Sequence, residues 1–376
     1  MADSSAPRKI GILGCGNIFP RYVEGMQRFS ELEIVHVADM DVERAREAAA
    51  TYGIPAFGVP EELYEDPAVE IVVNLTPPAF HASTIIAALQ AGKHVYVEKP
   101  LALSKVDARA VLNYARDAGL TVASAPDTFL GSANQTARRA LDDGMIGEPI
   151  GATAFVRHSR AETWHPNPGF LFGAGGGPVL DMGPYYVANL VNLLGPVQQV
   201  FASTRTGLRR RPVSAPDRAV DFVEVTVPTH ASASLSFTSG AVATTVMSFD
   251  VWHTELPYME IYGTEGTLSL PNPNTFDGDV RIKNLNDVEW RTLEPVTEPF
   301  GRVGTPDQYM RGLGVADLAG ALSGSSLRVN GEFAFHTLEV LGAFQESEDS
   351  GAPVNILSTC SRPEPRPTIY STQYSN

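Results

Sequence analysis

The chain has 376 residues, of which 43% are hydrophobic, and a formal net charge of -15 from 28 basic and 43 acidic side chains. This length predicts two domains of ordinary size. The negative charge would repel phosphate backbones and anionic membrane surfaces, so it disfavours nucleic acid and membranes as partners. The one basic tract, Arg209–Arg211, stands among prolines and is interpreted as a solvated loop.

Two cysteines, Cys15 and Cys360, are too few and too far apart for a disulfide framework or a metal site. No His, Cys, Asp and Glu residues cluster at metal-ligand spacing, so no metal is expected. No apolar run reaches the roughly 18 residues of a membrane span, and no apolar signal core follows the N-terminus. These features predict a cytoplasmic protein.

Strands and helices alternate over the first third of the chain. The helical segments are bounded by cap signals such as Asp41 and Gly53. Near-continuous Val and Ile strands between helices predict an α/β domain with a parallel sheet covered on both faces. Strands are expected at 8–14, 32–39, 70–76 and 94–98, and helices at 18–29, 41–53, 79–91 and 104–118.

The turn after the first strand carries Gly14-x-Gly16, a pattern that allows close approach of the backbone to a pyrophosphate. Phe19 stands at the third position, where the dinucleotide fingerprint has Gly or Ala. Asp39, which ends the second strand, can accept the ribose hydroxyls of NAD and would repel the 2′-phosphate of NADP, unless it merely caps the next helix. The pattern therefore favours an NAD-binding Rossmann domain. The cofactor turn is expected to comprise Gly14, Gly16, Asn17 and Ile18.

Lys99 follows the strand His94–Glu98, at the carboxyl end where ligands of doubly wound sheets bind. A single lysine after a strand can be a solvated surface residue. Pro100 changes this expectation, because a cis Lys99–Pro100 bond would direct the ammonium inward. Glu98 would then orient the cation or contact the cofactor.

Four segments follow one another at characteristic spacing, namely NLTPPAFH (74–81), AGKHVYVEKPLA (91–102), GGGPVLDMGPYY (175–186) and IYGTEGTL (261–268). In order and spacing they resemble the Gfo/Idh/MocA oxidoreductases, the family of glucose-fructose oxidoreductase and inositol dehydrogenase. The resemblance extends from Lys9 to about Gly351. It implies a Rossmann domain followed by an α/β domain with a large, open, mostly antiparallel sheet. The outer face of that sheet usually makes the oligomer contact, so a homodimer or homotetramer is expected.

The second part of the chain independently favours strands, with β-type segments at 149–158, 221–227, 230–252 and 258–263 and helices at 312–322 and 332–347. We assign 1–128 to an NAD-binding Rossmann domain and 129–360 to a substrate-binding and oligomerisation domain. Residues 361–376 are expected to form an extended tail.

The resemblance also implies catalytic residues. Lys99 matches the family's Glu-Lys-Pro lysine, and Asp181-x-Gly-x-Tyr185 matches a signature in which histidine usually takes the tyrosine's place. Glucose-fructose oxidoreductase is similar in carrying tyrosine there. We expect Tyr185 to donate and accept the proton, Lys99 to lower its pKa and bind the reacting oxygen, and Asp181 to hold Lys99 or a substrate hydroxyl. Alternatively, Tyr185 packs in its helix, as is expected for Tyr186.

Thr76, Pro77 and His81 match the family's cofactor-side loop, although His81 in a first helical turn can equally be structural. Asp127 stands where many relatives carry a different sequence and is expected to contact the substrate.

The loop 160–178 is the expected sugar-facing lid, with a plain surface loop as the alternative. Trp164 can stack on a sugar ring, and His165 and Asn167 can form hydrogen bonds.

These observations predict an NAD-dependent dehydrogenase that oxidises a secondary hydroxyl of an unphosphorylated sugar, glycoside or cyclitol. Two alternatives are an NAD-dependent glycosidase acting by transient oxidation and a noncatalytic nucleotide-sensing regulator. Retention of Lys99 and Asp181 disfavours the regulator. The sequence does not specify which sugar is bound, which of its carbon atoms is oxidised, or in which direction the reaction runs.

Overall fold

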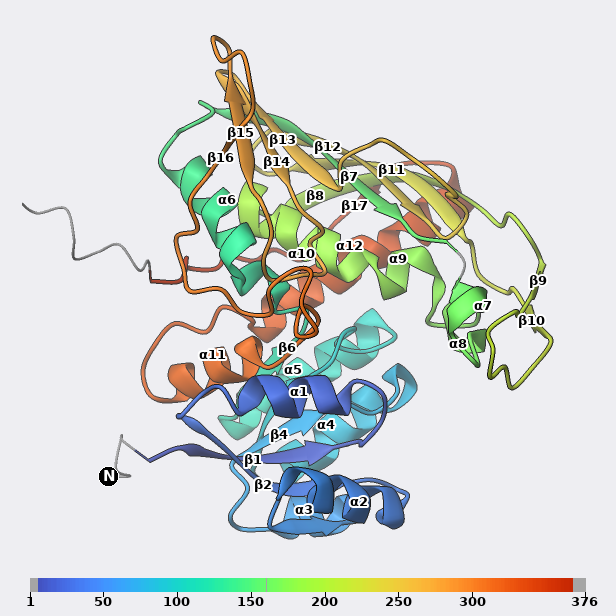
Figure 1. Ribbon diagram of the computed structural model, residues 1–376, viewed down its shortest axis with the longest axis vertical. Coiled ribbons are helices and arrows are strands. Elements are labelled where there is room, and N and C mark those ends of the chain that lie inside the picture. The colour runs from blue at the N-terminus through green and yellow to red at the C-terminus, as the bar shows by residue number, and fades with distance from the viewer. Residues whose placement is uncertain (1–5, 160, 368–376) are drawn as a thin grey trace, which may run out of the picture. The chain divides into compact units, whose positions relative to one another are not determined.

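The computed structural model describes residues 6–159 and 161–367. The chain divides into two compact units, Met1–Leu130 with Phe300–Phe335, and Gly131–Pro299 with His336–Asn376 (Figure 1). The first unit therefore includes a segment, Phe300–Phe335, that the sequence pattern places in the second domain.

The first unit contains a six-stranded sheet in the order β3-β2-β1-β4-β5-β6, in which every neighbouring pair is parallel. Because the strands are parallel, their carboxyl ends lie along one edge. The strands are β1 (Arg8–Leu13), β2 (Leu32–Ala38), β3 (Ala56–Gly58), β4 (Ile71–Asn74), β5 (His94–Val97) and β6 (Val122–Ser124). The helices are α1 (Phe19–Met26), α2 (Val42–Tyr52), α3 (Pro60–Glu65), α4 (His81–Gln90), α5 (Lys105–Ala118) and α11 (Leu313–Leu322), with short turns η1 (Pro78–Phe80) and η2 (Thr128–Leu130).

Local cap signals account for the helix boundaries in this unit. The Asp41 side chain accepts a hydrogen bond from the backbone N–H of Arg44 at the start of α2, and Gly53 ends that helix with a φ of 67°. Ser104 caps α5 in the same way. The predicted parallel sheet and the cis Lys99–Pro100 bond are both confirmed.

The second unit is built on a nine-stranded mixed sheet in the order β16-β15-β14-β13-β7-β12-β11-β8-β17. Strands β7 and β12 pair in parallel and the other neighbours pair antiparallel. Its strands are β7 (Pro149–Arg157), β8 (Val197–Arg205), β11 (His230–Phe237), β12 (Val242–Ser248), β13 (Met259–Gly263), β14 (Gly266–Leu270), β15 (Arg281–Asn284), β16 (Arg291–Thr292) and β17 (Val354–Asn355), beside a hairpin of β9 (Arg210–Pro212) and β10 (Phe222–Glu224). Its helices are α6 (Ser132–Asp142), α7 (Ala161–Trp164), α8 (Gly169–Phe172), α9 (Gly177–Asp181) and α10 (Gly183–Leu194), and α12 (Gly331–Ser350) begins in the first unit.

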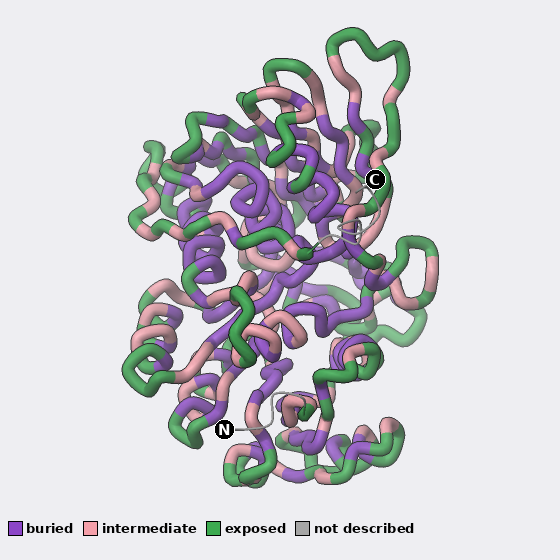
Figure 2. The backbone as a smooth tube through the Cα atoms, turned by 90° about the vertical axis from the view of Figure 1, so that its left-hand side faces the viewer, coloured by how far each residue is buried: buried purple, intermediate pink, exposed green. Residues whose placement is uncertain are grey.

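Helices cover one face of the nine-stranded sheet, where α6, α9, α10 and α12 lie together in Figure 1. Every residue of α10 is buried. Side chains alternate along the strands, so that Ala233 and Leu235 of β11 are buried while Ser232 and Ser234 are exposed. In Figure 2 the exposed residues lie mainly along the outer loops of the tube, and the buried residues lie mainly inside them.

No helix within the described residues is long and apolar enough to cross a membrane. Of the predicted tail, residues 361–367 form neither helix nor strand, and residues 368–376 lie outside the described part, as do residues 1–5.

Candidate active site

The glycine turn lies between the carboxyl end of β1 and the start of α1. Gly14 has a φ of 100°, and a Cβ atom there would lie 3.0 Å from the carbonyl of Leu75, so only glycine suits this position. A Cβ atom on Gly16 would meet nothing within 4 Å. Phe19, which stands where the dinucleotide fingerprint has Gly or Ala, is buried. Its ring packs edge-on against that of Tyr52, with 5.7 Å between the centroids. The turn fits a pyrophosphate at the N-terminus of α1.

Asp39 joins the end of β2 to this turn. One carboxylate oxygen accepts a hydrogen bond from the backbone N–H of Cys15 at 2.8 Å, and the other accepts from the N–H of Asp41 at 2.9 Å. The guanidinium of Arg44 lies 3.5 Å from the second oxygen. Arg44 was not expected from the sequence, although a basic residue in the first turn after the acidic residue is a usable signal. Burial, together with the charge of Asp39, raises the pKa of Cys15 to about 12, so the thiol stays protonated at neutral pH.

His81 joins the loop after β4 to the loop after β5. Its Nε2 lies 2.8 Å from the carbonyl oxygen of Thr76 and its Nδ1 lies 2.6 Å from that of Pro100. The ring is completely buried, and burial lowers its pKa. The Asn74 side chain accepts from both the backbone N–H and the hydroxyl of Thr76, which holds Thr76 and the following Pro77 at the sheet edge. This geometry favours the structural alternative for His81.

Glu98 holds the main chain beside Lys99. One of its oxygens accepts a hydrogen bond from the Tyr22 hydroxyl at 2.8 Å, and the other accepts from the backbone N–H of Lys99 at 2.8 Å. Tyr22 is completely buried, and burial raises its pKa, so its hydroxyl keeps its proton. Both Glu98 oxygens are therefore engaged within the first unit, and Lys99 is presented at the edge that also carries the glycine turn.

Asp127 has no exposed surface. One carboxylate oxygen accepts a hydrogen bond from the backbone N–H of Gly314 at 2.7 Å, which attaches the sheet edge to α11. Burial raises the pKa of Asp127, and the charge of Arg311 opposes that rise. This carboxylate positions α11, and its other oxygen is buried without a hydrogen-bond partner among the described residues, so contact of Asp127 with the substrate stays a prediction.

Asp181 and Tyr185 flank a tight junction between α9 and α10 in the second unit. A Cβ atom on Gly183 would lie 2.6 Å from a methyl group of Leu341 and 3.0 Å from the sulfur of Met247, so a larger residue would displace α10. Asp181 is partly exposed and Tyr185 is 7% exposed. Tyr186 lies in the core, as expected, with burial raising its pKa.

The predicted lid residues gather on α7, α8 and the segment between them. Trp164 is 57% exposed, and the ring of His165 lies edge-on between those of Trp164 and Phe170. The backbone N–H of Asn167 donates to Nδ1 of His165 at 3.0 Å. The three side chains therefore lie on one short segment, and Arg160, at its start, lies outside the described residues.

The basic tract at 209–211 is not uniformly solvated. Arg210 is 61% exposed, whereas the Arg211 side chain is 4% exposed and forms ion pairs with Glu162 and Asp250. The solvated-loop interpretation is thus wrong for Arg211. The reason is that residues 210–212 form strand β9, in which alternate side chains point to opposite faces.

No group of three or more His, Cys, Asp and Glu residues in the described ranges could hold a metal ion. Both cysteines are free thiols.

Comparisons with known proteins identify the family of the chain and agree with its fold. The family model "Oxidoreductase family, NAD-binding Rossmann fold" of the Gfo/Idh/MocA group matches residues 8–125, and the family's C-terminal domain model matches residues 134–269. D-xylose 1-dehydrogenase (NADP(+)) 2 of Haloferax volcanii is 29% identical over 92% of this chain and 99% of its own length. The 1,5-anhydro-D-fructose reductase of Ensifer adhaerens is 30% identical over 76% of this chain and 83% of its own. The crystal structure of an NAD-binding oxidoreductase from Klebsiella pneumoniae superposes with a TM-score of 0.82 at 27% identity, over 94% of this chain and 100% of that one.

Proposed function

The chain belongs to the Gfo/Idh/MocA oxidoreductases, and on that premise we propose that it is an NAD-dependent dehydrogenase acting on a secondary hydroxyl of an unphosphorylated sugar, glycoside or cyclitol. The observation that carries the proposal is the position of Lys99, which follows β5 at the sheet edge that also carries the Gly14–Gly16 turn after β1. A cation beside a dinucleotide site would stabilise the alkoxide-like state of an alcohol during its oxidation.

The cofactor residues in this proposal belong to the first unit. The backbone of Gly14, Gly16, Asn17 and Ile18 would hold the pyrophosphate, Asp39 the ribose, and Thr76 and Pro77 the nicotinamide side of the edge. When bound, NAD supplies the hydride acceptor. His81 and Glu98 would act indirectly, since both hold the loops that present Thr76 and Lys99.

The proton chemistry falls to three side chains. Tyr185 removes the proton from the substrate hydroxyl as the carbon–hydrogen bond breaks, and returns it in the reverse direction. Lys99 stabilises negative charge on the reacting oxygen as the proton leaves. Asp181 binds a neighbouring substrate hydroxyl.

The names of two relatives and the chemistry of the predicted lid support this substrate class. Two of the relatives are named as a D-xylose dehydrogenase and a 1,5-anhydro-D-fructose reductase. Trp164, His165 and Asn167 offer one aromatic face and several hydrogen-bonding groups to such a ligand. The net charge of -15 disfavours a phosphorylated one.

A specific observation supports NADP as a second candidate cofactor. The Arg44 guanidinium next to Asp39 is 53% exposed and is able to pair with a 2′-phosphate, and the Haloferax volcanii relative is named for NADP. We retain NAD as the first candidate because the carboxylate of Asp39, directly after β2, would repel the 2′-phosphate of NADP.

We further propose a cytoplasmic homo-oligomer. Phe201 of β8 and Val242 of β12 are exposed on the nine-stranded sheet, where a second copy would cover them.

The test is NADH absorbance on mixing the protein with NAD⁺ and a panel of unphosphorylated hexoses, pentoses, inositols and glycosides, repeated with NADP⁺. A rise with one sugar class would support the dehydrogenase. If NAD⁺ binds but no sugar is oxidised, the proposal is wrong, and release of free sugar from a glycoside would point to transient oxidation instead.

A further inference from the structure

Residues 161–172, which carry the predicted lid side chains, pack on the β9–β10 hairpin, and α7 and α8 lie beside β9 and β10 in Figure 1. Three backbone N–H groups in and near the hairpin donate to carbonyl oxygens along this segment: Ser214 to Glu162 at 2.8 Å, Ala219 to Pro166 at 2.9 Å and Thr226 to Phe172 at 2.9 Å. Because these bonds are spread over the segment, its start, middle and end are all tied to the hairpin.

The segment and the hairpin also share a small apolar core. It consists of Ala161, Leu171 and Phe172 of the segment, Val213, Ala215, Val223 and Val225 in and beside the hairpin, and Phe249 after β12. Met182, which stands between Asp181 and Gly183 at the α9–α10 junction, packs against this core. The segment is thus part of a packed body that reaches the neighbour of Asp181.

The glycine-rich stretch 173–177 that follows the segment is closely packed. A Cβ atom on Gly176 would lie 2.3 Å from the carbonyl oxygen of Phe170, so the two backbones touch at a position where only glycine fits. The backbone N–H of Gly176 also donates to the carbonyl oxygen of Gly173 at 2.9 Å. The segment therefore has the contacts of a fixed wall and not those of a loop that opens freely.

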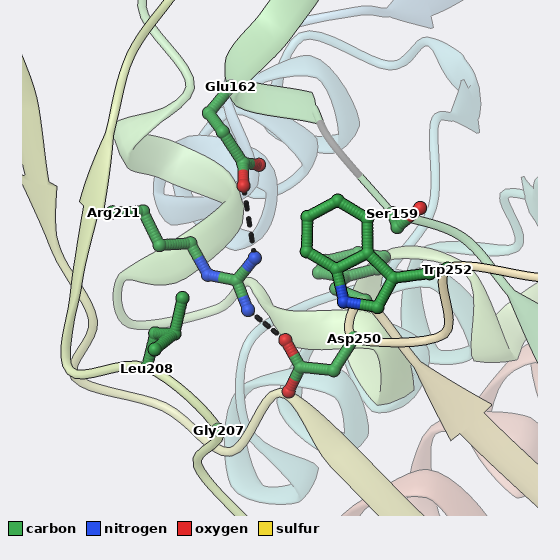
Figure 3. Close-up of a pocket in the computed structure, with 8 residues that line it drawn as sticks. Ser159, Glu162, Gly207, Leu208, Arg211, Asp250 and Trp252 are labelled. Carbon is green, nitrogen blue, oxygen red and sulfur yellow. Dashed lines mark hydrogen bonds and ion pairs between the residues drawn. The ribbon is translucent and has the colours of Figure 1, made fainter.

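Arg211 of β9 joins both ends of the segment to the nine-stranded sheet. Its side chain is 4% exposed, and its guanidinium lies 3.1 Å from Glu162 in α7, pairs with Asp250 after β12, and stacks on the ring of Phe172 in α8 at 4.8 Å from the centroid. Figure 3 shows Arg211 between the two carboxylates. Asp250 is held in turn by the Thr229 hydroxyl, which donates to it at 2.5 Å. A planar guanidinium has several N–H donors in fixed directions, so one side chain can hold two carboxylates in a set geometry.

The position of Glu162 determines that of the aromatic side chains after it. Glu162 is two residues before Trp164 in the short helix α7. The ring centroids of Trp164 and His165 are 5.5 Å apart, and those of His165 and Phe170 are 5.1 Å apart. A displacement of Glu162 would therefore move this whole row of rings.

We propose that Arg211 is a positioning residue for the sugar site. Through Glu162 it fixes residues 161–172 as a preformed wall, on which Trp164 faces the substrate. The inference deepens the proposed function and rests on it, because that function assigns a sugar to these side chains. Buried ion pairs carry a desolvation cost, and apolar residues of the same volume often stabilise a fold at least as well. The need for a fixed wall accounts for the ion pairs in this place.

The variants change Glu162, because Arg211 then keeps its pairing with Asp250 and the fold is disturbed less than by loss of the arginine. Glu162→Ala removes the contact with Arg211. Glu162→Gln keeps the reach of the side chain without its charge, whereas Glu162→Asp keeps the charge but is one methylene shorter. The matched control is Glu224→Ala, because Glu224 pairs with the exposed neighbour Arg210.

Steady-state kinetics with NAD⁺ and the best sugar are the first measurement. Glu162→Ala should raise KM for the sugar by about tenfold and leave kcat per folded molecule and NAD⁺ affinity within about twofold, because contacts of the wall with the ground state and the transition state are lost alike. Glu162→Gln should recover most of this loss, Glu162→Asp should not, and Glu224→Ala should behave as the unmodified protein. A fall in kcat at unchanged KM would indicate a purely structural role and overturn the proposal, as would equal KM values in all variants. If Glu162→Ala does not fold, the comparison of Glu162→Gln with Glu162→Asp decides.

The second measurement needs no turnover. Trp252→Phe and Trp290→Phe leave Trp164 as the only tryptophan, and its fluorescence anisotropy reports whether the segment is fixed. The anisotropy should fall in Glu162→Ala and Glu162→Asp and be kept in Glu162→Gln; an unchanged anisotropy in the first two would overturn the proposal. If no sugar is oxidised but the anisotropy falls as expected, the proposed function is wrong and the fixing of the segment by Arg211 is supported.

Discussion

Carboxylates are held by different partners at the carboxyl edge of the parallel sheet and in the cluster of Arg211, Glu162 and Asp250 in the second unit. At the sheet edge, the carboxylate oxygens of Asp39 and Glu98 accept hydrogen bonds from nearby groups, most of them backbone N–H groups. In the cluster, side chains from distant segments form ion pairs with one another. Glu162 and Arg211 each keep one buried atom without a hydrogen-bond partner among the described residues. Backbone N–H donors that the fold holds in place suit a ligand of constant shape such as a dinucleotide, whereas the cluster around Arg211 depends on ion pairs between distant segments.

The largest expected effect is at the first edge. Lys99→Ala should lower kcat/KM by about 10³-fold or more, because the reacting oxygen loses its cation. NADH absorbance with the best sugar measures it, and Lys105→Ala, in the first turn of α5, is the control. Persistence of activity in Lys99→Ala would remove the lysine from the mechanism.

Tyr185→Phe should lower kcat by about 10²-fold with little change in NAD affinity, because a proton acceptor is lost while the ring is kept. Stopped-flow turnover and a fluorescence titration with NADH separate the two quantities. Tyr186→Phe, at its buried neighbour, should retain turnover. If Tyr185→Phe turns over normally, the tyrosine only packs.

Arg211→Met should reduce the free energy of unfolding of the second unit by about 3–5 kcal/mol, because the buried Glu162 carboxylate and the partly buried Asp250 carboxylate would both lose their cation. Chemical denaturation measures it. The adjacent Arg210→Met should change stability by about 0.5 kcal/mol or less, since Arg210 and its partner Glu224 are exposed. Equal effects of the two substitutions would contradict the contrast between these neighbours.

The preference between NAD and NADP should depend on two neighbouring side chains, Asp39 after β2 and Arg44 in α2. Asp39→Ala should lower the ratio of kcat/KM for NAD to that for NADP by about tenfold, and Arg44→Ala should raise it. Steady-state kinetics with both cofactors measure the ratio. An unmodified enzyme that prefers NADP would refute the choice of NAD.

The smallest effect concerns pH and stability in the second unit. Nε2 of His336 accepts a hydrogen bond from the backbone N–H of Val197 at 3.0 Å, so the folded state requires a neutral ring, and burial lowers the pKa of His336. The unfolded chain gains a proton below about pH 6.5 while the folded chain does not. Stability is therefore full above that pH and falls as the pH decreases toward the folded-state pKa. Thermal unfolding between pH 7.5 and pH 5.5 measures this loss, which His336→Gln should reduce; an unchanged slope would contradict it.

Much of the first unit could be predicted because its signals are local. Strand and helix alternation, the caps Asp41 and Ser104, and the Gly14 turn each depend on a few neighbouring residues. Strand β3 was missed, since three residues carry little periodicity. The placement of Phe300–Phe335 in the first unit was also missed, because it depends on long-range contacts such as that between Asp127 and Gly314.

The family, the two sheet types and the candidate residues Lys99, Asp181 and Tyr185 can be predicted from the sequence, because they depend on periodicity and on short motifs. The burial of individual polar residues, in contrast, follows from the tertiary structure. The single residue step from Arg210 to Arg211 turns a side chain from solvent into the interior, and its two carboxylate partners come from segments about 40 and 50 residues away in the chain. Local sequence patterns do not identify partners so distant in the chain, because burial depends on how the strands pair and pack.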